Sequence, residues 1–173
     1  MLPLGFSAGL PFLLVFSTLS VWLVEEDVSR TAVGFFAWVG ITYSIKFLWA
    51  PFIDSIQIGF LTRKLGRRRS WIIVGQAGVV LGLSLMAIFG PKNIVIFSIF
   101  AFLVAFSSAT QDVSIDAYRI EAANKESQGA MTAAYVFGYR LALLVSGAGT
   151  LYAAANFSWS FAYILMAGLM FLG

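Results

Sequence analysis

Long apolar runs constrain this 173-residue chain more than any other feature of its sequence. A hydrocarbon core about 30 Å thick needs about 20 apolar residues in a helix, and a helix satisfies its own backbone hydrogen bonds there. Five runs meet that length, and a sixth is still apolar at Gly173. We therefore predict an all-α membrane protein. The predicted spans are residues 4–24, 31–53, 71–90, 94–118 and 129–152, with an incomplete sixth at 159–173.

Composition supports the membrane class and excludes several kinds of chemistry. Apolar residues make up 60% of the chain and charged residues 11%, whereas soluble domains have about 45–50% and 25%. The chain has no cysteine and no histidine, which excludes disulfides, thiolate nucleophiles and histidine-based metal sites. We expect no metal and no cofactor. Any proton chemistry must then use aspartate or glutamate.

The basic residues predict the orientation of the chain. Short cytoplasmic loops carry an excess of Lys and Arg. The chain has a net charge of +3, and one loop, residues 54–70, holds five of its 11 basic residues. This gives the charge a topological explanation, so we expect no nucleic-acid partner. We predict that this loop and the N-terminus are cytoplasmic and that residues 25–30 lie outside. The basic residues of the loop are Arg63, Lys64, Arg67, Arg68 and Arg69.

Four charged residues lie inside the predicted spans. Asp112 and Asp116 are one helical turn apart in the fourth span, Lys46 is in the second and Arg140 in the fifth. Ionisable residues within a membrane cost a few kcal/mol or more and are candidates for functional sites. At 1.5 Å per residue, Asp112 lies about 9 Å from Tyr118 and Lys46 about 10 Å from residue 53, so their depths match. Arg140 is close to the midplane.

Helical periodicity groups the polar residues on common faces. Ser108, Asp112, Asp116 and Arg119 fall within one narrow arc, whereas Glu121 points the opposite way, past the predicted helix end, and reads as a solvated loop charge. Asp112 and Asp116 are the candidates for proton coupling. The candidates for substrate binding or charge pairing are Lys46, Arg140, Tyr43, Trp49, Ser108, Gln111 and Tyr139.

Two interpretations of these residues remain open at this point. The charges either neutralise one another and fix helix packing, or at least one carboxylate takes up a proton while Lys46 or Arg140 faces an anionic substrate. Burial favours the protonated form of a carboxylate, and an adjacent cation favours the charged form. Movement that changes the pairing would couple protonation to conformation, which is a workable mechanism for a secondary transporter.

Several segments resemble the AmpG-type muropeptide permeases. The most specific is residues 103–121, LVAFSSATQDVSIDAYRIE, followed by Gln128 and Gly129. Other segments agree in order along nearly the whole chain. They are residues 5–11 (GFSAGLP), 46–51 (KFLWAP) with Asp54, 66–71 (GRRRSW) and 135–140 (YVFGYR).

The resemblance implies a major facilitator fold, with two six-helix halves around a central cavity. This chain is similar to the N-terminal half, residues 1–173, with its sixth helix truncated, so a C-terminal half or a second copy would complete it. The resemblance further implies an importer in the bacterial inner membrane that is driven by the proton gradient and carries anhydro-muropeptides. A cytoplasmic latch would contain Asp54, Gly66, Arg67, Arg68 and Arg69, with Asp116 or Arg119 as partners.

Other functions are compatible with the same residues. Relatives that carry acetyl-coenzyme A share the resemblance, and a half that does not transport is a further alternative. An intramembrane enzyme that acts on lipid-linked sugars would use Asp112 and Asp116 as acid and base. No third acid, metal-binding motif or nucleotide loop accompanies that pair, so we expect that the chain is not an enzyme.

Overall fold

The computed structural model describes residues 1–122 and 126–173, and helices dominate both stretches. The predicted all-α membrane fold is confirmed, because five helical stretches are long and apolar enough to cross a bilayer: Leu2–Glu25, Arg30–Leu48, Arg67–Lys92, Ile94–Ala122 and Gln128–Asn156. A shorter apolar stretch follows at Trp159–Leu172. The helices are α1 (Leu2–Val15), α2 (Ser17–Glu25), α3 (Arg30–Phe36), η1 (Ala37–Gly40), α4 (Ile41–Ser44), η2 (Lys46–Leu48), α5 (Ala50–Ser55), α6 (Gly59–Leu65), α7 (Arg67–Phe89), η3 (Gly90–Lys92), α8 (Ile94–Ala122), α9 (Gln128–Leu144), the π-helical turn η4 (Val145–Gly149), α10 (Thr150–Asn156), α11 (Trp159–Leu169) and η5 (Met170–Leu172).

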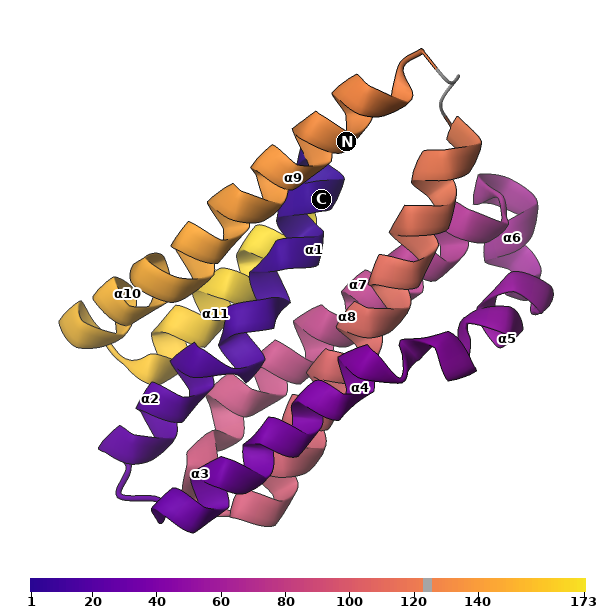
Figure 1. Ribbon diagram of the computed structural model, residues 1–173. Coiled ribbons are helices and arrows are strands. Elements are labelled where there is room, and N and C mark those ends of the chain that lie inside the picture. Colours follow the sequence, from indigo (N-terminus) through magenta and orange to yellow (C-terminus); the bar gives the residue numbers. More distant parts are fainter. Residues whose placement is uncertain (123–125) are drawn as a thin grey trace.

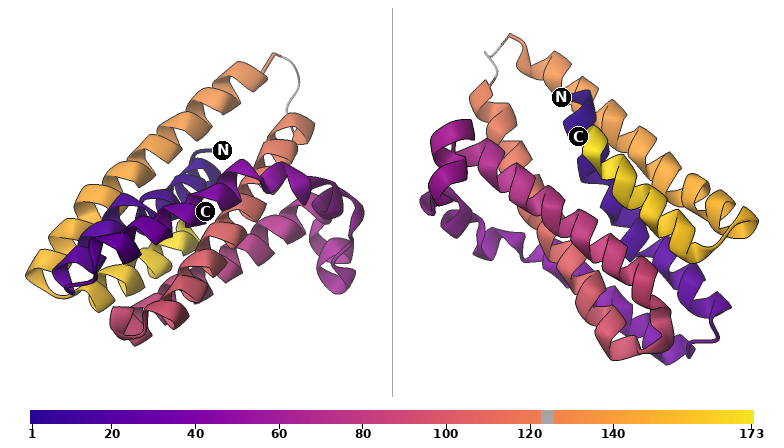
Figure 2. Two further views of the ribbon diagram at one scale, coloured as in Figure 1. Left: turned by 60° about the horizontal axis from the view of Figure 1, so that its bottom comes forward. Right: turned by 180° about the vertical axis from the view of Figure 1, so that it is seen from behind.

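The long helices lie side by side in one bundle (Figure 1). α7 and α8, which are neighbours in sequence, form an extensive pair, and α1 runs along α9 although more than 100 residues separate them. α11 packs against α7 and so joins the two groups. The ends of the chain consequently lie close together, as both views in Figure 2 show.

The first span is not one continuous helix. Pro11 lies inside α1, and a proline removes one backbone hydrogen bond from a helix. The helix ends at Val15, and α2 begins at Ser17 after the irregular residue Phe16. Just beyond this break, the Thr18 hydroxyl donates a buried hydrogen bond of 3.0 Å to the carbonyl of Ser146 in η4. The break in the first span therefore contacts the π-helical turn of the fifth.

The second predicted span, residues 31–53, is not one regular α-helix in the structure. The structure divides it into α3, η1, α4, η2 and α5. Pro51 stands at the start of α5, where its missing N–H interrupts the ladder of a continuous helix, and Gly34 and Gly40 weaken the segment before it. The division matters for the site, because it places Lys46 in the short 3-10 turn η2 instead of within a long helix.

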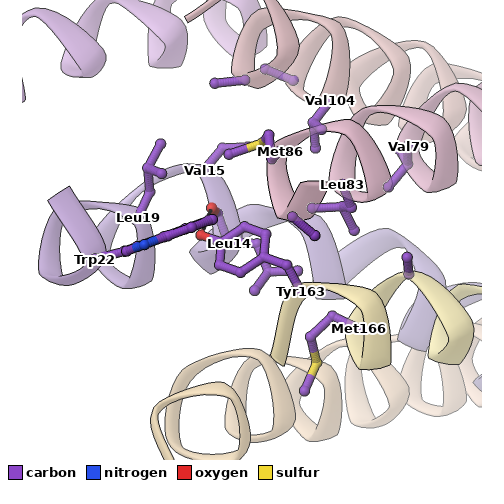
Figure 3. Close-up of a cluster of buried hydrophobic side chains, with 14 of the residues drawn as sticks. Leu14, Val15, Leu19, Trp22, Val79, Leu83, Met86, Val104, Tyr163 and Met166 are labelled. Carbon is purple, nitrogen blue, oxygen red and sulfur yellow. Dashed lines mark hydrogen bonds between the residues drawn. The ribbon is translucent and has the colours of Figure 1, made fainter. Parts of the chain in front are cut away.

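A buried apolar cluster at the centre of the bundle contains side chains from all five long helical stretches and from α11 (Figure 3). Trp22 of α2 contacts the ring of Tyr163 of α11, with 4.7 Å between the ring centroids. The Tyr163 hydroxyl, buried among apolar groups, donates a hydrogen bond of 2.8 Å to the carbonyl of Leu14. The members of this cluster from α7 and α8 include Leu83, Met86 and Val104, all fully buried. This cluster fixes α1, α7, α8 and α11 relative to one another.

Glycines allow α1 and α9 to approach backbone to backbone. A Cβ added at Gly9 would lie 2.7 Å from the carbonyl oxygen of Tyr139, and one added at Gly5 would overlap the carbonyl of Tyr135. From the other helix, a Cβ at Gly138 would overlap the carbonyl of Leu2. Small residues at such positions are how membrane helices gain close van der Waals contact.

The orientation of the chain in the membrane is open to a direct test. Because the chain has no native cysteine, single cysteines at two exposed loop positions, Lys64→Cys and Glu26→Cys, report the two sides. We expect a thiol reagent that cannot cross the membrane to label Glu26→Cys from the periplasm at once and Lys64→Cys only after the cells are opened. The reverse labelling pattern would show that the basic loop faces outward.

Candidate functional site

An ion pair between two spans forms the centre of the candidate site. Lys46 in η2 and Asp112 in α8 place Nζ and Oδ2 3.8 Å apart. The side chains are 33% and 17% exposed, so the pair is shielded on most sides. Of the two cations considered from the sequence, the structure brings Lys46 to Asp112. Arg140 lies on an exposed face of α9, and no ion pair of Arg140 occurs among residues 1–122 and 126–173.

Unpaired hydrogen-bonding atoms surround this ion pair. The hydroxyls of Tyr43 and Ser108 face each other next to Asp112. By distance and angle, these two hydroxyls and Asp112 Oδ1 make no hydrogen bond within the described part of the chain, and all three atoms are buried. Buried polar atoms in proteins almost always have a partner. These atoms are therefore the candidates for hydrogen bonds with a bound molecule, in which the Asp112 carboxylate would accept and the two hydroxyls could donate or accept.

Aromatic rings form the walls next to the pair. Tyr43 packs against Phe12 and Phe16 of the first span, with ring centroids 5.8 and 5.7 Å apart. On the α9 side, Tyr139 lies near Asp112 and next to Tyr135, whose ring centroid is 6.3 Å away. Tyrosines combine an apolar ring with a polar hydroxyl. The site can thus contact both the flat face and the polar substituents of a ligand.

Two residues predicted as substrate contacts form contacts between helices in the structure. Gln111 donates a buried hydrogen bond of 3.0 Å to Ser7 in α1, and its Cβ faces Gly75 in α7. Trp49 donates to the hydroxyl of Thr110 over 3.2 Å, and its ring packs on Phe106. The structure therefore does not group Gln111 and Trp49 with the polar atoms around Asp112.

Asp116, the second predicted proton carrier, has a different environment from Asp112. Arg119, one turn further along α8, pairs with it at 3.4 Å. The Arg119 guanidinium also lies 5.2 Å from the centre of the Tyr135 ring, a distance suited to a cation–π contact. The Asp116 side chain is 47% exposed, so its charge is solvated as well as paired.

A separate charge cluster ties three spans together at the end that carries the basic loop. Arg68 at the start of α7 pairs with Asp54 of α5 and with Glu121 of α8, where Nη2 and Oε1 are 2.8 Å apart. Gly66, with a φ of +82°, allows the sharp turn between α6 and α7. Arg67 is exposed, and Arg69 donates to the Tyr118 hydroxyl over 3.0 Å.

The reading of Glu121 as a solvated loop charge is wrong. α8 continues to Ala122, one turn beyond the predicted end, and this extension brings Glu121 level with Arg68. Glu121 is therefore the residue of α8 that pairs with Arg68, whereas Asp116 and Arg119 pair with each other. The signal in the sequence was an acidic residue that follows the apolar run within one turn, on the same side of the membrane as the basic loop.

Comparisons with known proteins identify relatives along nearly the whole chain. The family model described as acetyl-coenzyme A transporter 1 matches residues 1–93. A Rickettsia felis protein named as the transporter AmpG 1 is 34% identical over 169 residues, which are 97% of this chain and 38% of that protein. The anhydromuropeptide permease of Escherichia coli is 37% identical over 172 residues, which are 98% of this chain and 34% of the permease.

These matches cover more than half of the chain by family model and nearly all of it by relatives above 30% identity. The chain spans about two fifths of the length of the curated relatives it matches. The relatives are named as transporters or permeases, which agrees with a helical bundle that encloses charged groups. The chain is a multi-pass membrane protein that belongs to the family of AmpG-type permeases and acetyl-coenzyme A transporter 1, within the major facilitator superfamily.

Proposed function

We propose that the protein to which this chain contributes is a proton-coupled secondary transporter that imports anhydro-muropeptides across the bacterial inner membrane. The observation that carries the proposal is the shielded Lys46–Asp112 pair with unpaired polar atoms beside it. Such an arrangement stabilises a charge within the membrane and leaves capacity to bind a polar molecule. The name of the Escherichia coli relative, anhydromuropeptide permease, supports this substrate class.

The chemistry of the site suits a glycopeptide. Sugar rings stack on aromatic side chains, and carboxylates require a cation in a medium of low dielectric constant. Tyr43 and Tyr139 supply the rings, and Lys46 supplies the cation once its contact with Asp112 loosens. Arg140 is a second cation, about 17 Å along α9 from Gly129 and thus near the middle of the span.

Asp112 is the stronger candidate for the proton carrier. It is more shielded than Asp116, and its nearest cation belongs to another span, whereas Arg119 is on the same helix as Asp116. A change in the distance between η2 and α8 would therefore change how strongly Lys46 stabilises the charged form of Asp112. Protonation of Asp112 would release Lys46 for an anionic substrate, and this exchange would link proton movement to substrate movement.

A second bundle would complete the cavity. The apolar windows of Arg30–Leu48 and Gln128–Asn156 are each 17% buried, against 61% for Leu2–Glu25. Arg140 belongs to one of these open spans, and a charge near the bilayer centre faces protein or a water-filled cavity in preference to lipid. We therefore place either a further six-helix half or a second copy against this side, with the cluster of Asp54, Arg68 and Glu121 as a latch.

Acetyl-coenzyme A is the second candidate substrate, because the matching family model describes a transporter of that name. Its phosphates would bind Lys46 and Arg140 as strong anions and would need fewer hydroxyl contacts than a disaccharide. The two substrates can be separated by direct competition in the same transport assay.

The test is uptake by the complete protein in sealed vesicles. We expect labelled anhydro-muropeptide to accumulate when the proton gradient is directed inward, and a protonophore to abolish the accumulation. Excess unlabelled acetyl-coenzyme A should not compete. Accumulation of labelled acetyl-coenzyme A alone would refute the glycopeptide assignment, and uptake of muropeptide that ignores the protonophore would refute the coupling.

A further inference from the structure

The short helix α6 exposes large apolar side chains outside the bundle. Phe60 is 69% exposed and Leu65 is 41% exposed, and Ile56, just before the helix, is 49% exposed. The main contacts of α6 are with α7, and Figure 1 shows it at the edge of the molecule, away from the central cluster. Exposed apolar residues in such a group, beside polar ones, mark an interaction surface.

Positive charges without acidic partners stand beside these apolar groups. Arg63, Lys64 and Arg67 are exposed, and none forms an ion pair with another described residue. The three residues outside the described stretches, 123–125, include no acid. Arg68 differs from these three cations, because Asp54 and Glu121 both neutralise it.

The connectivity places this surface at the boundary of the bilayer. Only residues 56–66 separate the end of α5 from the start of α7, so α6 cannot move far from the ends of the spans. The Trp71 indole donates a hydrogen bond of 3.1 Å to the carbonyl of Ile56, which attaches the segment to α7. Lys64 places its ammonium 4.6 Å from the centre of the Phe60 ring. The cationic groups and the apolar side chains of α6 are thus held at the same depth relative to the bilayer.

We propose that α6 and the first turn of α7 form a binding surface for anionic phospholipids. Arg63, Lys64 and Arg67 contact the phosphates of the headgroups, while Phe60 and Leu65 enter the boundary of the acyl chains. Juxtamembrane Lys and Arg residues attract anionic lipids, and apolar side chains on a short amphipathic segment insert at the same depth.

Lipid suits this surface better than a water-soluble polyanion. A soluble anion would satisfy the three cations but would leave Phe60 and Leu65 exposed to water, whereas a lipid satisfies both groups. A hollow of about 220 Å³ lies next to this surface, lined by Leu65, Gly66, Arg67, Arg68, Arg69, Tyr118, Glu121 and Ala122. Its three arginines, Arg67, Arg68 and Arg69, outnumber its one acid, Glu121, so the hollow also favours a phosphate group.

The test measures which lipid lies next to α6 in the whole chain. A single cysteine at exposed Gln57 carries a fluorophore, and the protein is placed in nanodiscs of phosphatidylcholine and phosphatidylglycerol in equal amounts. Either lipid is then added with a nitroxide quencher near its headgroup. We expect labelled phosphatidylglycerol to quench at least roughly twofold more strongly, and the triple variant Arg63→Gln, Lys64→Gln, Arg67→Gln to lose this preference.

The matched control replaces exposed cations near the other ends of the spans, Arg30→Gln with Lys92→Gln, and should keep the preference. Equal helix content by circular dichroism identifies variants that are folded. Equal quenching by the two lipids in the unsubstituted chain would overturn the proposal, and so would the absence of quenching, which would mean that protein or water covers α6. Loss of the preference in excess inorganic phosphate, but not in chloride of equal ionic strength, would also overturn it in favour of a site for free anions.

Discussion

Asp112→Asn is expected to abolish gradient-driven uptake by the complete protein and to destabilise it by about 3 kcal/mol. The substitution leaves the Lys46 ammonium without its counter-charge, and removal of one partner from a buried pair typically costs about 3–5 kcal/mol. We place the cost at the lower end because the Lys46 side chain is 33% exposed and can partly be solvated. Uptake in vesicles and thermal unfolding in detergent measure the two effects.

A double-mutant cycle separates the ion pair from other effects of the substitution. Lys46→Gln in the Asp112→Asn background should recover about 1–2 kcal/mol of the lost stability, since neither charge is then left alone. Arg140→Gln is the matched control, because it removes a cation from a span without removing the partner of Asp112. Additive effects of Lys46→Gln and Asp112→Asn would show that the two side chains do not interact. Coupling between Asp112→Asn and Arg140→Gln would instead identify Arg140 as the counter-charge of Asp112.

The second large effect is expected from Gly138→Ala, which should destabilise the bundle by about 3 kcal/mol, the upper part of the range for overpacked sites. The added Cβ would overlap the carbonyl of Leu2, and a backbone atom of α1 cannot rotate away as a side chain can. The helices α1 and α9 would therefore have to separate along the face that holds Gly5 and Gly9. A shift of the unfolding transition in detergent measures the loss.

Gly34→Ala is the control for this substitution, because no atom lies within 4 Å of its added Cβ. Alanine favours helix over glycine by about 1 kcal/mol, so this variant should be as stable as the unsubstituted chain or slightly more stable. If both alanine variants gave the same stability, the close approach of α1 and α9 at Gly138 would be refuted.

The sequence was sufficient to predict the fold class, and it also indicated that Lys46 and Asp112 could meet. The length of each apolar run predicts a membrane-spanning helix, because backbone groups within a bilayer must be hydrogen-bonded and a helix pairs them within one segment. The rise of 1.5 Å per residue likewise places Lys46 and Asp112 at matching depths. Neither argument requires knowledge of which helices are neighbours.

The neighbours of each site residue depend on how each helix is turned about its axis and on where the helices break. Asp112, Gln111 and Ser108 lie within about one turn of α8, yet Gln111 bonds to Ser7 in α1 while Ser108 and Asp112 face Tyr43. Apolar content is similar around the whole circumference of a membrane helix, so periodicity does not reveal which face meets a neighbour. The choice of Lys46 over Arg140 follows from packing, because η2, which carries Lys46, contacts α8.

The ion-pair cluster of Asp54, Arg68 and Glu121 likewise depends on both the sequence and the packing. The basic loop and Asp54 are evident in the sequence, but their partner Glu121 depends on where α8 ends. Helix ends are set by the contacts of the last turn, and those contacts exist only after α5, α7 and α8 have come together. The sequence by itself therefore determined that charges lie within and beside the spans, and only the tertiary structure decided how they pair, because pairing depends on distances between helices that are remote in the chain.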